Sequence, residues 1–244
     1  MITFQDVTIE LNGVRALEEV SLCVEPGELM GLVGPSGAGK SVLLKAACGL
    51  IPVTSGRIEI AETPLNELSE DEILDLRRRI GMLFQQGALF DALSVFENVA
   101  FPLRRRDWPE QEITDRVLIE LERVGLSHAA HLLPEELSGG MRKRTGIARA
   151  LVTDPPVGLF DEPIAGLDPV TGSRILNLLR TASTERKVTS IAVGHELDTL
   201  LPVCDRVAML LDGRLVYLGS ASEMPEAEHL AVRQFFMGSE EGPL

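Results

Sequence analysis

The stretch "GPSGAGKS", residues 34–41, constrains the fold of this chain more than any other feature. It fits the pattern G-x-x-x-x-G-K-[ST] and lies between two apolar runs, "LMGLV" at 29–33 and "VLLKAACGL" at 42–50. The glycines let the backbone turn so that its N–H groups face a phosphate chain at the start of a helix. The sequence therefore predicts a strand, a phosphate-binding loop and a helix in this order.

The residue types within this loop indicate what each position would do. Gly34, Gly37 and Gly39 supply the turning backbone. Lys40 would neutralise the outer phosphates of a nucleotide, and the Ser41 hydroxyl would ligate Mg²⁺. We therefore expect ATP with Mg²⁺ as the ligand of this loop.

A second signal is "PVGLFDEP" at 156–163, an apolar run that ends in two carboxylates. In α/β sheets, ligands bind outside the carboxyl ends of the strands. Asp161 is placed to hold the metal shell, and Glu162 is placed to polarise an attacking water.

A third signal is "ELSGGMRKRTGIARAL" at 136–151, in which Ser138 precedes two glycines and a basic amphipathic helix. The N–H groups at such a helix start offer a second site to an anion. Arg142, Lys143 and Arg144 are open to two interpretations, a nucleic-acid contact or a solvated helix face, and the charge of the chain favours the second.

The overall composition excludes several classes of protein. Lys plus Arg is 23 against 37 for Asp plus Glu, a net charge of -14, so the electrostatic footprint of a nucleic-acid binder is missing. No uninterrupted apolar run is long enough to span a bilayer, and the start "MITFQDVTIE" does not resemble a secretory signal. Cys23, Cys48 and Cys204 are widely spaced in apolar runs and favour a reducing, cytoplasmic compartment.

Taken together, the motifs resemble those of the ATP-binding subunits of ABC transporters along essentially the whole chain. They occur in the family's order: the Walker A motif at 34–41, the Q-loop at Gln85, the signature "LSGGM" at 137–141, the Walker B motif "GLFDE" at 158–162, the D-loop "AGLD" at 165–168 and the switch histidine His195.

The resemblance implies a mechanism in which two copies face each other head to tail. Ser138 and Gly140 of one copy would contact the γ-phosphate held by Lys40 of the other. In that scheme Gln85 joins Ser41 around Mg²⁺, and Glu162 acts as the base. His195 stabilises the transferring phosphoryl group, and Asp168 connects the two sites.

The residues expected to contact ATP are Gly34, Pro35, Ser36, Gly37, Ala38, Gly39, Lys40, Ser41, Val42, Ser138, Gly139, Gly140 and Asp168. Two positions depart from the family pattern. Met141 replaces the commoner Gln of the signature, and "IELNGVRAL" at 9–17 lacks the aromatic ring on which adenine usually stacks. We expect adenine to lean on Leu11 or Val14 instead.

The predicted fold is of the α/β class, a P-loop NTPase (RecA-like) core with an N-terminal antiparallel β-subdomain and an inserted α-helical subdomain. We expect a single domain over 1–244, with the core and β-subdomain in 1–86 and 151–225. The helical subdomain is expected in 87–150, and 226–244 would form a short C-terminal tail.

The segment after Gln85 indicates the kind of transporter. "GMLFQQGALFDALSVFENVAFPLR", with "ELSGGMRKR" and "VRQFF", is similar to the ATPases of Mla-type systems, which move phospholipids or other hydrophobic molecules together with Mce-type proteins. The resemblance implies a peripheral position on the cytoplasmic face of the inner membrane. It also implies a permease docked near Gly87–Asp91, with an Mce-domain protein and a periplasmic lipid-binding protein as further partners.

Two alternatives remain open for the biological system. The first alternative is the same ATPase on another permease, such as that of an amino-acid or lipoprotein system. A soluble ABC ATPase acting on ribosomes or DNA is disfavoured by the lack of tandem cassettes, long coiled-coil insertions or a basic surface.

Within 85–103 the sequence predicts a capped helix with one face toward the core. Ser94 with Glu97 forms an expected capping box, as does Ser69 with Glu72. Phe96, Val99 and Leu103 follow at helical spacing and are expected to face the core.

Overall fold

The computed structural model describes residues 1–85, 87–239 and 241–243, and it confirms the α/β class. The predicted boundary at residue 86 lies outside the described residues. The strands are β1 Ile2–Leu11, β2 Val14–Val24, β3 Leu29–Val33, β4 Ser55–Ile60, β5 Thr63–Pro64, β6 Ile80–Leu83, β7 Val157–Asp161, β8 Thr189–Val193, β9 Arg206–Leu211 and β10 Arg214–Gly219. The α-helices are α1 Lys40–Ala47, α2 Glu70–Arg77, α3 Val95–Arg104, α4 Glu110–Arg123, α5 Gly139–Leu151, α6 Pro169–Thr184, α7 Leu197–Leu200 and α8 Leu230–Met237. Short 3₁₀ turns occupy Leu65–Glu67, Ser127–Ala129, Pro134–Glu136, Leu201–Val203 and Ala221–Glu226.

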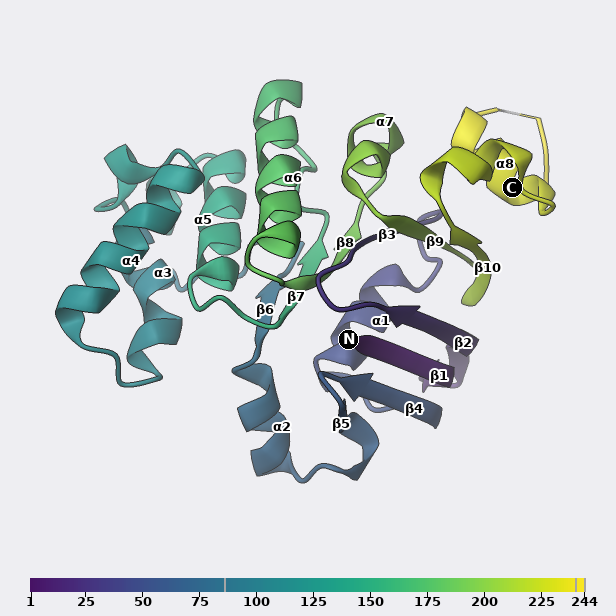
Figure 1. Cartoon of the computed structure of the whole chain (residues 1–244), viewed down its shortest axis with the longest axis horizontal. Helices are drawn as coiled ribbons and strands as arrows, with labels where there is room; N and C mark the ends of the chain where they lie inside the picture. Colours follow the sequence, from purple (N-terminus) through teal and green to yellow (C-terminus); the bar gives the residue numbers. More distant parts are fainter. Residues whose placement is uncertain (86, 240, 244) are drawn as a thin grey trace.

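The first sheet is antiparallel, with the strand order β2-β1-β4-β5 (Figure 1). Its first hairpin turns at Asn12-Gly13, where Leu11 faces Val14 across the turn. Asn12 and Gly13 both have positive φ, 51° and 78°, as a tight hairpin turn of this kind requires.

The second sheet has the strand order β10-β9-β3-β8-β7-β6, in which only the β9–β10 pair is antiparallel. Because β3, β8, β7 and β6 are parallel neighbours, their carboxyl ends lie side by side at one edge. The phosphate loop, His195, Glu162 and Gln85 each follow one of these strands. The topology therefore gathers at one edge four motifs that are far apart in the sequence.

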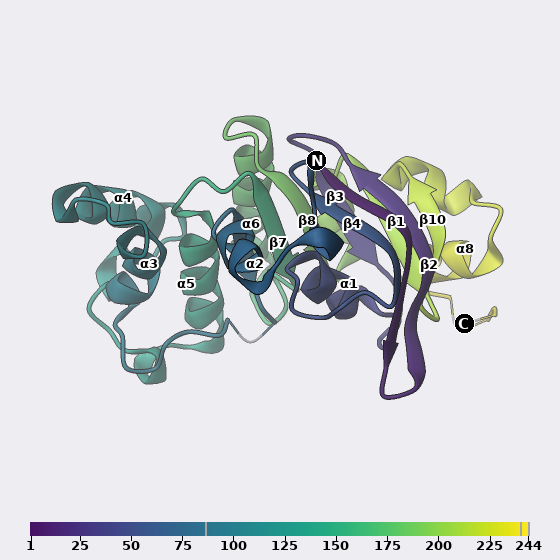
Figure 2. The same cartoon turned by 90° about the horizontal axis from the view of Figure 1, so that it is seen from below.

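Two hydrophobic cores hold the layers together. One lies between the antiparallel sheet and one face of the six-stranded sheet, and α1 packs into it through Leu43 and Leu44. The other lies on the opposite face and extends into the helices α3, α4 and α5, which form the left-hand lobe of Figure 1. Figure 2 shows α1 beside the antiparallel sheet and α6 farther from it, toward the lobe of α3, α4 and α5.

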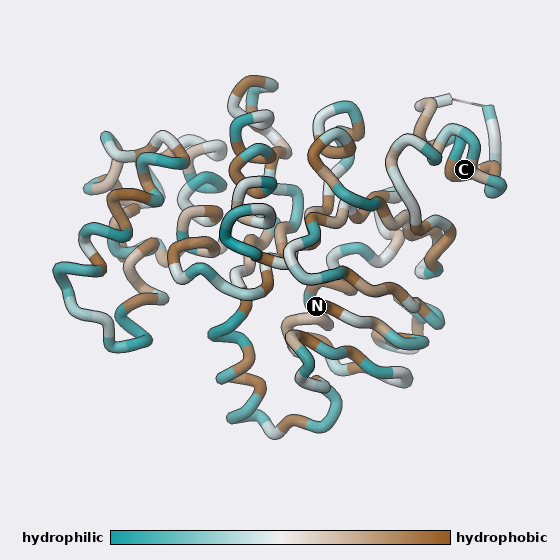
Figure 3. The backbone as a smooth tube through the Cα atoms, viewed as in Figure 1, coloured by the Kyte–Doolittle hydropathy of each residue, from teal (hydrophilic) through white to brown (hydrophobic). Residues whose placement is uncertain are grey.

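The helix α4 of this lobe is amphipathic. Ile113, Val117 and Leu121 are fully buried along one stripe of α4. Hydrophobic and hydrophilic stretches alternate along α4 in Figure 3, as in an amphipathic helix. In the part of the chain that the structure describes, no helix is both long and apolar enough to cross a bilayer.

The two expected capping boxes differ in outcome. Ser69 and Glu72 form both reciprocal bonds at the start of α2, as predicted. Ser94 accepts a hydrogen bond from the Glu97 N–H, but the Glu97 carboxylate pairs with Arg104 one to two turns later. The second box is therefore half formed, because an arginine near the end of the same helix competes for the carboxylate.

Candidate nucleotide site and an adjoining groove

The phosphate loop connects β3 to α1 through backbone conformations that side chains would obstruct. Gly34 has φ 137°, and a Cβ there would lie 2.1 Å from the Leu210 carbonyl oxygen. Gly39 has φ 99°, and a Cβ there would lie 2.7 Å from the Ala16 carbonyl oxygen. Both glycines are therefore required by the space around the loop as well as by its turn.

Lys40 folds back over this loop at the start of α1. Its Nζ donates to the carbonyl oxygens of Gly34 and Pro35, each at 2.7 Å. Burial lowers the pKa of Lys40, and the carboxylates of Glu162 and Asp161 oppose that shift. In the nucleotide-free chain the Lys40 ammonium group is therefore bound by two neutral carbonyl oxygens. Phosphate oxygens of a nucleotide can replace these carbonyl groups as its partners.

Asp161 ends β7 and is 4% exposed. Burial raises the pKa of its carboxyl, whereas a hydrogen bond from the Ser41 side chain favours the ionised form. Among the described residues, Asp161 Oδ1 has no hydrogen-bond partner. A buried carboxylate oxygen without a partner beside a serine hydroxyl fits a hard cation such as Mg²⁺.

Glu162 is the point at which three separate motifs meet. Gln85 Nε2 donates to Glu162 Oε2 at 3.1 Å, and His195 Nε2 lies 3.2 Å from Glu162 Oε1. Glu162 itself has a left-handed φ of 52°, and its N–H donates to the Val193 carbonyl oxygen at the end of β8. Both carboxylate oxygens are therefore occupied by side chains from neighbouring strand ends.

The signature residues contact the loop 164–168 of their own chain. Ser138 caps α5 by accepting from the Met141 N–H at 3.2 Å. A Cβ at Gly140 would lie 2.8 Å from Leu167 Cδ2, so the two segments pack closely. Asp168 caps α6 by accepting from the N–H groups of Val170 and Thr171. A hydrogen bond from the Thr171 side chain, together with these backbone bonds, lowers the pKa of Asp168.

The remaining predicted contact residues lie around this edge. Ser36 and Gly37 are partly or largely exposed in the loop, Ala38 is buried and Val42 is half-buried at the start of α1. Val14 is 67% exposed, whereas Leu11 is partly buried against the first core, so Val14 offers the freer apolar surface to a base.

The prediction of a solvated face for the basic stretch 142–144 is wrong. Lys143 is 8% exposed and donates to the Ala165 carbonyl oxygen at 2.5 Å. Arg142 donates to the Leu137 carbonyl at 2.6 Å, and Arg144 donates to the Val124 carbonyl at 2.9 Å. These cations therefore bind carbonyl oxygens of neighbouring turns, because the loop 164–168 and the end of α4 cover the helix.

A hollow of about 460 Å³ adjoins the phosphate loop and is lined by Ser41, Lys45, Gln85, Asp91, Arg142 and Asp161, among others. Sequence analysis did not single out Lys45, whose charge lies close enough to Asp161 to favour the ionised carboxylate. Its position one helical turn after Ser41 is the signal that identifies it.

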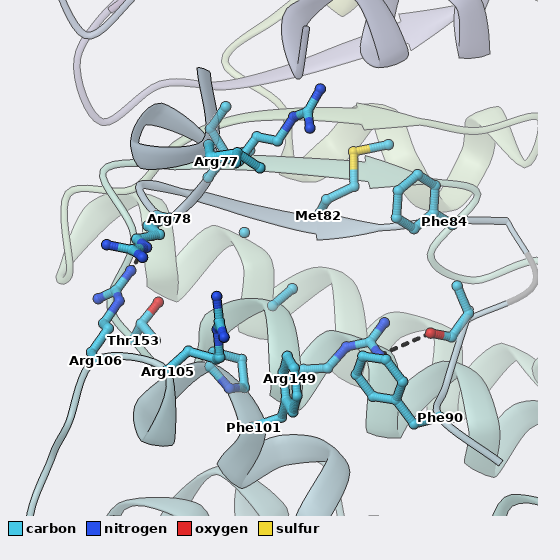
Figure 4. A pocket seen from close by; sticks show the side chains of 16 residues that line it. Arg77, Arg78, Met82, Phe84, Phe90, Phe101, Arg105, Arg106, Arg149 and Thr153 are labelled. Atoms are coloured by element: carbon cyan, nitrogen blue, oxygen red, sulfur yellow. Dashed lines mark hydrogen bonds between the residues drawn. The ribbon is translucent and has the colours of Figure 1, made fainter. Parts of the chain in front are cut away.

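A second hollow, also of about 460 Å³, adjoins the first. Phe84 and Ala88 line both hollows and lie between them. Figure 4 shows the arginine and aromatic side chains that surround it. We call it the arginine-rimmed groove and define it by Arg77, Arg78, Arg105, Arg106 and Arg149 with Met82, Phe84, Phe90 and Phe101.

The groove is built by contacts that fix the loop 87–91. Arg149 donates to the carbonyl oxygens of Gly87 at 2.9 Å and Ala88 at 2.8 Å, and its guanidinium lies 5.8 Å from the Phe90 ring centroid. The fully buried Asn98 accepts from the Phe90 N–H at 2.8 Å and donates to its carbonyl at 3.1 Å. Sequence analysis missed both residues, since each lies within a helical pattern.

Phe96, Val99 and Leu103 pack against the core of the helical lobe, as predicted. Within the loop, Leu89 also packs against this core, whereas Phe90 is 43% exposed. The loop is therefore partly core and partly surface.

Comparison with known proteins identifies the family. The family model described as "ABC transporter" matches residues 17–165. The methionine import ATP-binding protein MetN of Carboxydothermus hydrogenoformans is 42% identical over 227 residues, which cover 92% of this chain and 67% of that protein. The intermembrane phospholipid transport system ATP-binding protein MlaF of Haemophilus influenzae is 37% identical over 245 residues, covering 100% of this chain and 93% of that protein.

Solved structures agree with this match. The dimeric structure of the bacterial ABC transporter cassette MJ0796 superposes with a TM-score of 0.85 at 34% identity, covering 90% of this chain and 98% of that one. A post-hydrolysis dimer of the same cassette with ADP and Pi matches with a TM-score of 0.85 at 33% identity, over the same shares of both chains. This chain therefore belongs to the ABC transporter family as an ATP-binding domain with the ABC ATPase cassette fold, and its cofactors are ATP and Mg²⁺.

Proposed function

We propose that this chain is the ATP-hydrolysing subunit of a membrane transporter and works as a head-to-tail homodimer with ATP between the copies. The observation that carries the proposal is the convergence of Gln85 and His195 on Glu162, at the strand end beside Lys40 and Asp161. The dimeric state of the similar MJ0796 cassette supports the dimer.

In the proposed reaction the loop 34–42 and Lys40 bind the phosphates of ATP. Ser41, Asp161 and Gln85 hold Mg²⁺, which neutralises phosphate charge when it is bound. Glu162 takes a proton from a water whose oxygen bonds to the γ-phosphorus. At the same time the bond from that phosphorus to the bridging oxygen breaks, and ADP and Pi are released.

The hydrogen bonds at Glu162 have a consequence for this reaction. Gln85 and His195 occupy both carboxylate oxygens in the nucleotide-free chain. One of these oxygens has to be released before it can accept a proton from water. In our proposal Gln85 turns to Mg²⁺ when ATP arrives, and His195 then contacts the γ-phosphoryl group.

The second copy completes each site in the proposed dimer. Ser138, Gly139 and Gly140 of one copy bind the γ-phosphate on the other through the N–H groups at the start of α5. Asp168 lies between the two sites, and Val14 with Leu11 supports the adenine.

The proposed permease contact is the arginine-rimmed groove together with the loop Gly87–Asp91. Although the chain carries a net charge of -14, five arginines surround this one hollow. Within the described ranges, Arg77, Arg105, Arg106 and Arg149 form no ion pair with an acidic side chain. Charge complementarity therefore favours an amphipathic permease segment that brings carboxylates to the rim and apolar side chains to the floor.

For the transported substrate we propose phospholipid or another hydrophobic molecule, with Mce-domain and periplasmic lipid-binding proteins as further partners and a peripheral position on the cytoplasmic face of the inner membrane. The similarity of the segment 81–104 to Mla-type ATPases supports this choice, as does the MlaF relative, which matches 100% of this chain. Methionine import is the second candidate, favoured by the 42–43% identity of several MetN relatives.

Glu162→Gln tests the ATPase assignment. The variant should bind ATP with near wild-type affinity and turn it over about 10²–10³-fold more slowly, since its amide oxygen can still accept from Gln85 but the amide cannot take a proton from water. Glu185→Gln, an exposed substitution at the end of α6, is the control. Near-normal turnover in Glu162→Gln would reject Glu162 as the base.

A transport assay with the permease that co-purifies with this chain tests the substrate class. The permease that binds this chain, reconstituted with it in vesicles containing fluorescent phospholipid, should show ATP-dependent lipid movement. ATP-dependent uptake of methionine without lipid movement would establish the second candidate instead.

A further inference from the structure

Lys143 is a buried cation that the proposed reaction does not use. It lies in the second turn of α5, directly behind the signature, and its Nζ donates to the Ala165 carbonyl oxygen at 2.5 Å. Within the part of the chain described by the structure, no carboxylate lies within ion-pair distance of Lys143. The amine of Lys143 is therefore satisfied by a neutral carbonyl oxygen rather than by a carboxylate.

The acidic side chains that act electrostatically on Lys143 lie at or near the nucleotide site of its own chain. The carboxylates of Glu162, Glu196 and Asp161 all act on it, although burial has the larger effect and lowers the pKa of Lys143. Interactions between charges are strong where water is largely excluded. Binding of nucleotide and Mg²⁺, or release of a phosphate, changes the charge that Lys143 experiences.

Lys143 is also part of a rigid connection. Ala165 opens the loop 165–168, and Leu167 of that loop packs against Gly140 so closely that a Cβ on Gly140 would lie 2.8 Å away. The signature and this loop are therefore joined at two points, by one hydrogen bond and one apolar contact. A shift of either segment moves the other.

We infer that Lys143 is a positioning residue that couples the charge of a chain's own catalytic site to the signature segment that the chain presents to the second copy. The inference rests on the proposed head-to-tail dimer, because there the signature contacts the ATP of the other copy. Lys143 then makes each site sensitive to what the other site holds, and hydrolysis becomes cooperative in ATP.

Three substitutions separate the charge of Lys143 from its role as a tether. Lys143→Met removes both the charge and the donor, Lys143→Gln keeps a donor without the charge, and Lys143→Arg keeps the charge. Lys187→Met, at an exposed lysine in the turn before β8, is the matched control. The full-length chain is assayed for ATP hydrolysis over a range of ATP concentrations, and ADP binding is measured by calorimetry.

We expect a Hill coefficient above 1 for the wild-type chain, falling to about 1 in Lys143→Met and Lys143→Gln, with turnover reduced about tenfold. Lys143→Arg and Lys187→Met should keep the cooperativity, and ADP affinity should stay within about twofold in every variant because the phosphate loop is intact. Thermal unfolding identifies any variant that fails to fold, and Lys143→Gln, which keeps the hydrogen-bond donor, then decides the question.

Full cooperativity in Lys143→Gln, or a Hill coefficient of about 1 in the wild type, would overturn the inference. A wild-type chain that binds ATP but shows no turnover would instead contradict the proposed function. The two failures are therefore distinguishable.

Discussion

The nucleotide site and the arginine-rimmed groove are two hollows of about 460 Å³ that share a wall but differ in how their charges are balanced. In the nucleotide site Lys40 and Lys45 face Asp161 and Glu162, so cations and carboxylates compensate one another. In the groove five arginines line the hollow together with aromatic rings, and among the described residues only Arg78 of these five forms an ion pair, with Asp75. The difference agrees with our proposal that the first hollow takes a ligand with phosphate and metal and the second a permease segment with carboxylates.

The double substitution Arg105→Glu with Arg106→Glu tests the charge of the groove and has the largest expected effect on the comparison. It should weaken binding to the permease at least about tenfold, because like charges would then meet at the rim. ATP turnover of the free chain should stay within about twofold, since neither arginine lines the nucleotide hollow.

Arg79→Glu is the control, because it reverses the charge of one exposed arginine that does not line the groove. Arg79 belongs to the arginine triplet 77–79, whereas the double variant changes two residues of the triplet 104–106. Binding to the detergent-solubilised permease can be measured by interferometry. Wild-type affinity in the double variant would show that carboxylates of the partner do not contact this rim.

Asn98→Ala removes hydrogen bonds that hold the loop 87–91 between the two hollows, without changing the charge of either hollow. Asn98 is fully buried and bonds both the N–H and the carbonyl of Phe90. Its loss should lower the free energy of unfolding by about 1–3 kcal/mol, because backbone groups would be left without partners. Urea titration measures this change.

Asn66→Ala is the control for Asn98→Ala, since Asn66 also bonds two backbone groups but does so at the exposed end of β4. We expect a smaller loss of stability there. An Asn98→Ala chain as stable as the wild type would mean that the wall does not depend on this side chain.

Asp161→Asn has the smallest expected effect, and its sign depends on the ligand. Burial raises the pKa of Asp161 above its unfolded value, so wild-type stability falls as the pH rises from that unfolded value through the folded pKa. The amide should therefore raise Tm by about 2–4 °C at neutral pH without nucleotide and lose this advantage at acidic pH.

With Mg²⁺ and ATP present, the order should reverse, because only the carboxylate fits the metal. Differential scanning fluorimetry with and without the ligands distinguishes the two signs. Asp115→Asn, an exposed change on α4, is the control. A lower Tm for Asp161→Asn without ligand would show that the ionised Asp161 carboxylate does not destabilise the fold.

The phosphate loop was predictable because its glycine pattern is local. The positive φ of Gly34 and Gly39 follows from that pattern, whereas the close approach of the Leu210 and Ala16 carbonyl oxygens comes from the strands β9 and β2 and was not predictable from the loop. The meeting of Gln85, Glu162 and His195 was inferred from the family resemblance. Spacing along the chain would not have supplied it, since it depends on the order of β8, β7 and β6 in the sheet.

The groove and the burial of Lys143 could not be predicted from the sequence. The two arginine triplets lie 25 residues apart and are brought together by the ends of α2 and α3, where Arg106 donates to the Arg78 carbonyl. Helical periodicity gives the face on which Lys143 lies, but it does not say that the loop 164–168 covers that face. Tertiary contacts from other segments decided both outcomes.

The left-handed backbone at Glu162 has a consequence for the stability of the chain. A non-glycine residue in that conformation costs about 1–2 kcal/mol, and the buried carboxylate before it adds a further cost at neutral pH. Glycine at 162 and an amide at 161 would therefore stabilise the nucleotide-free chain at the expense of turnover.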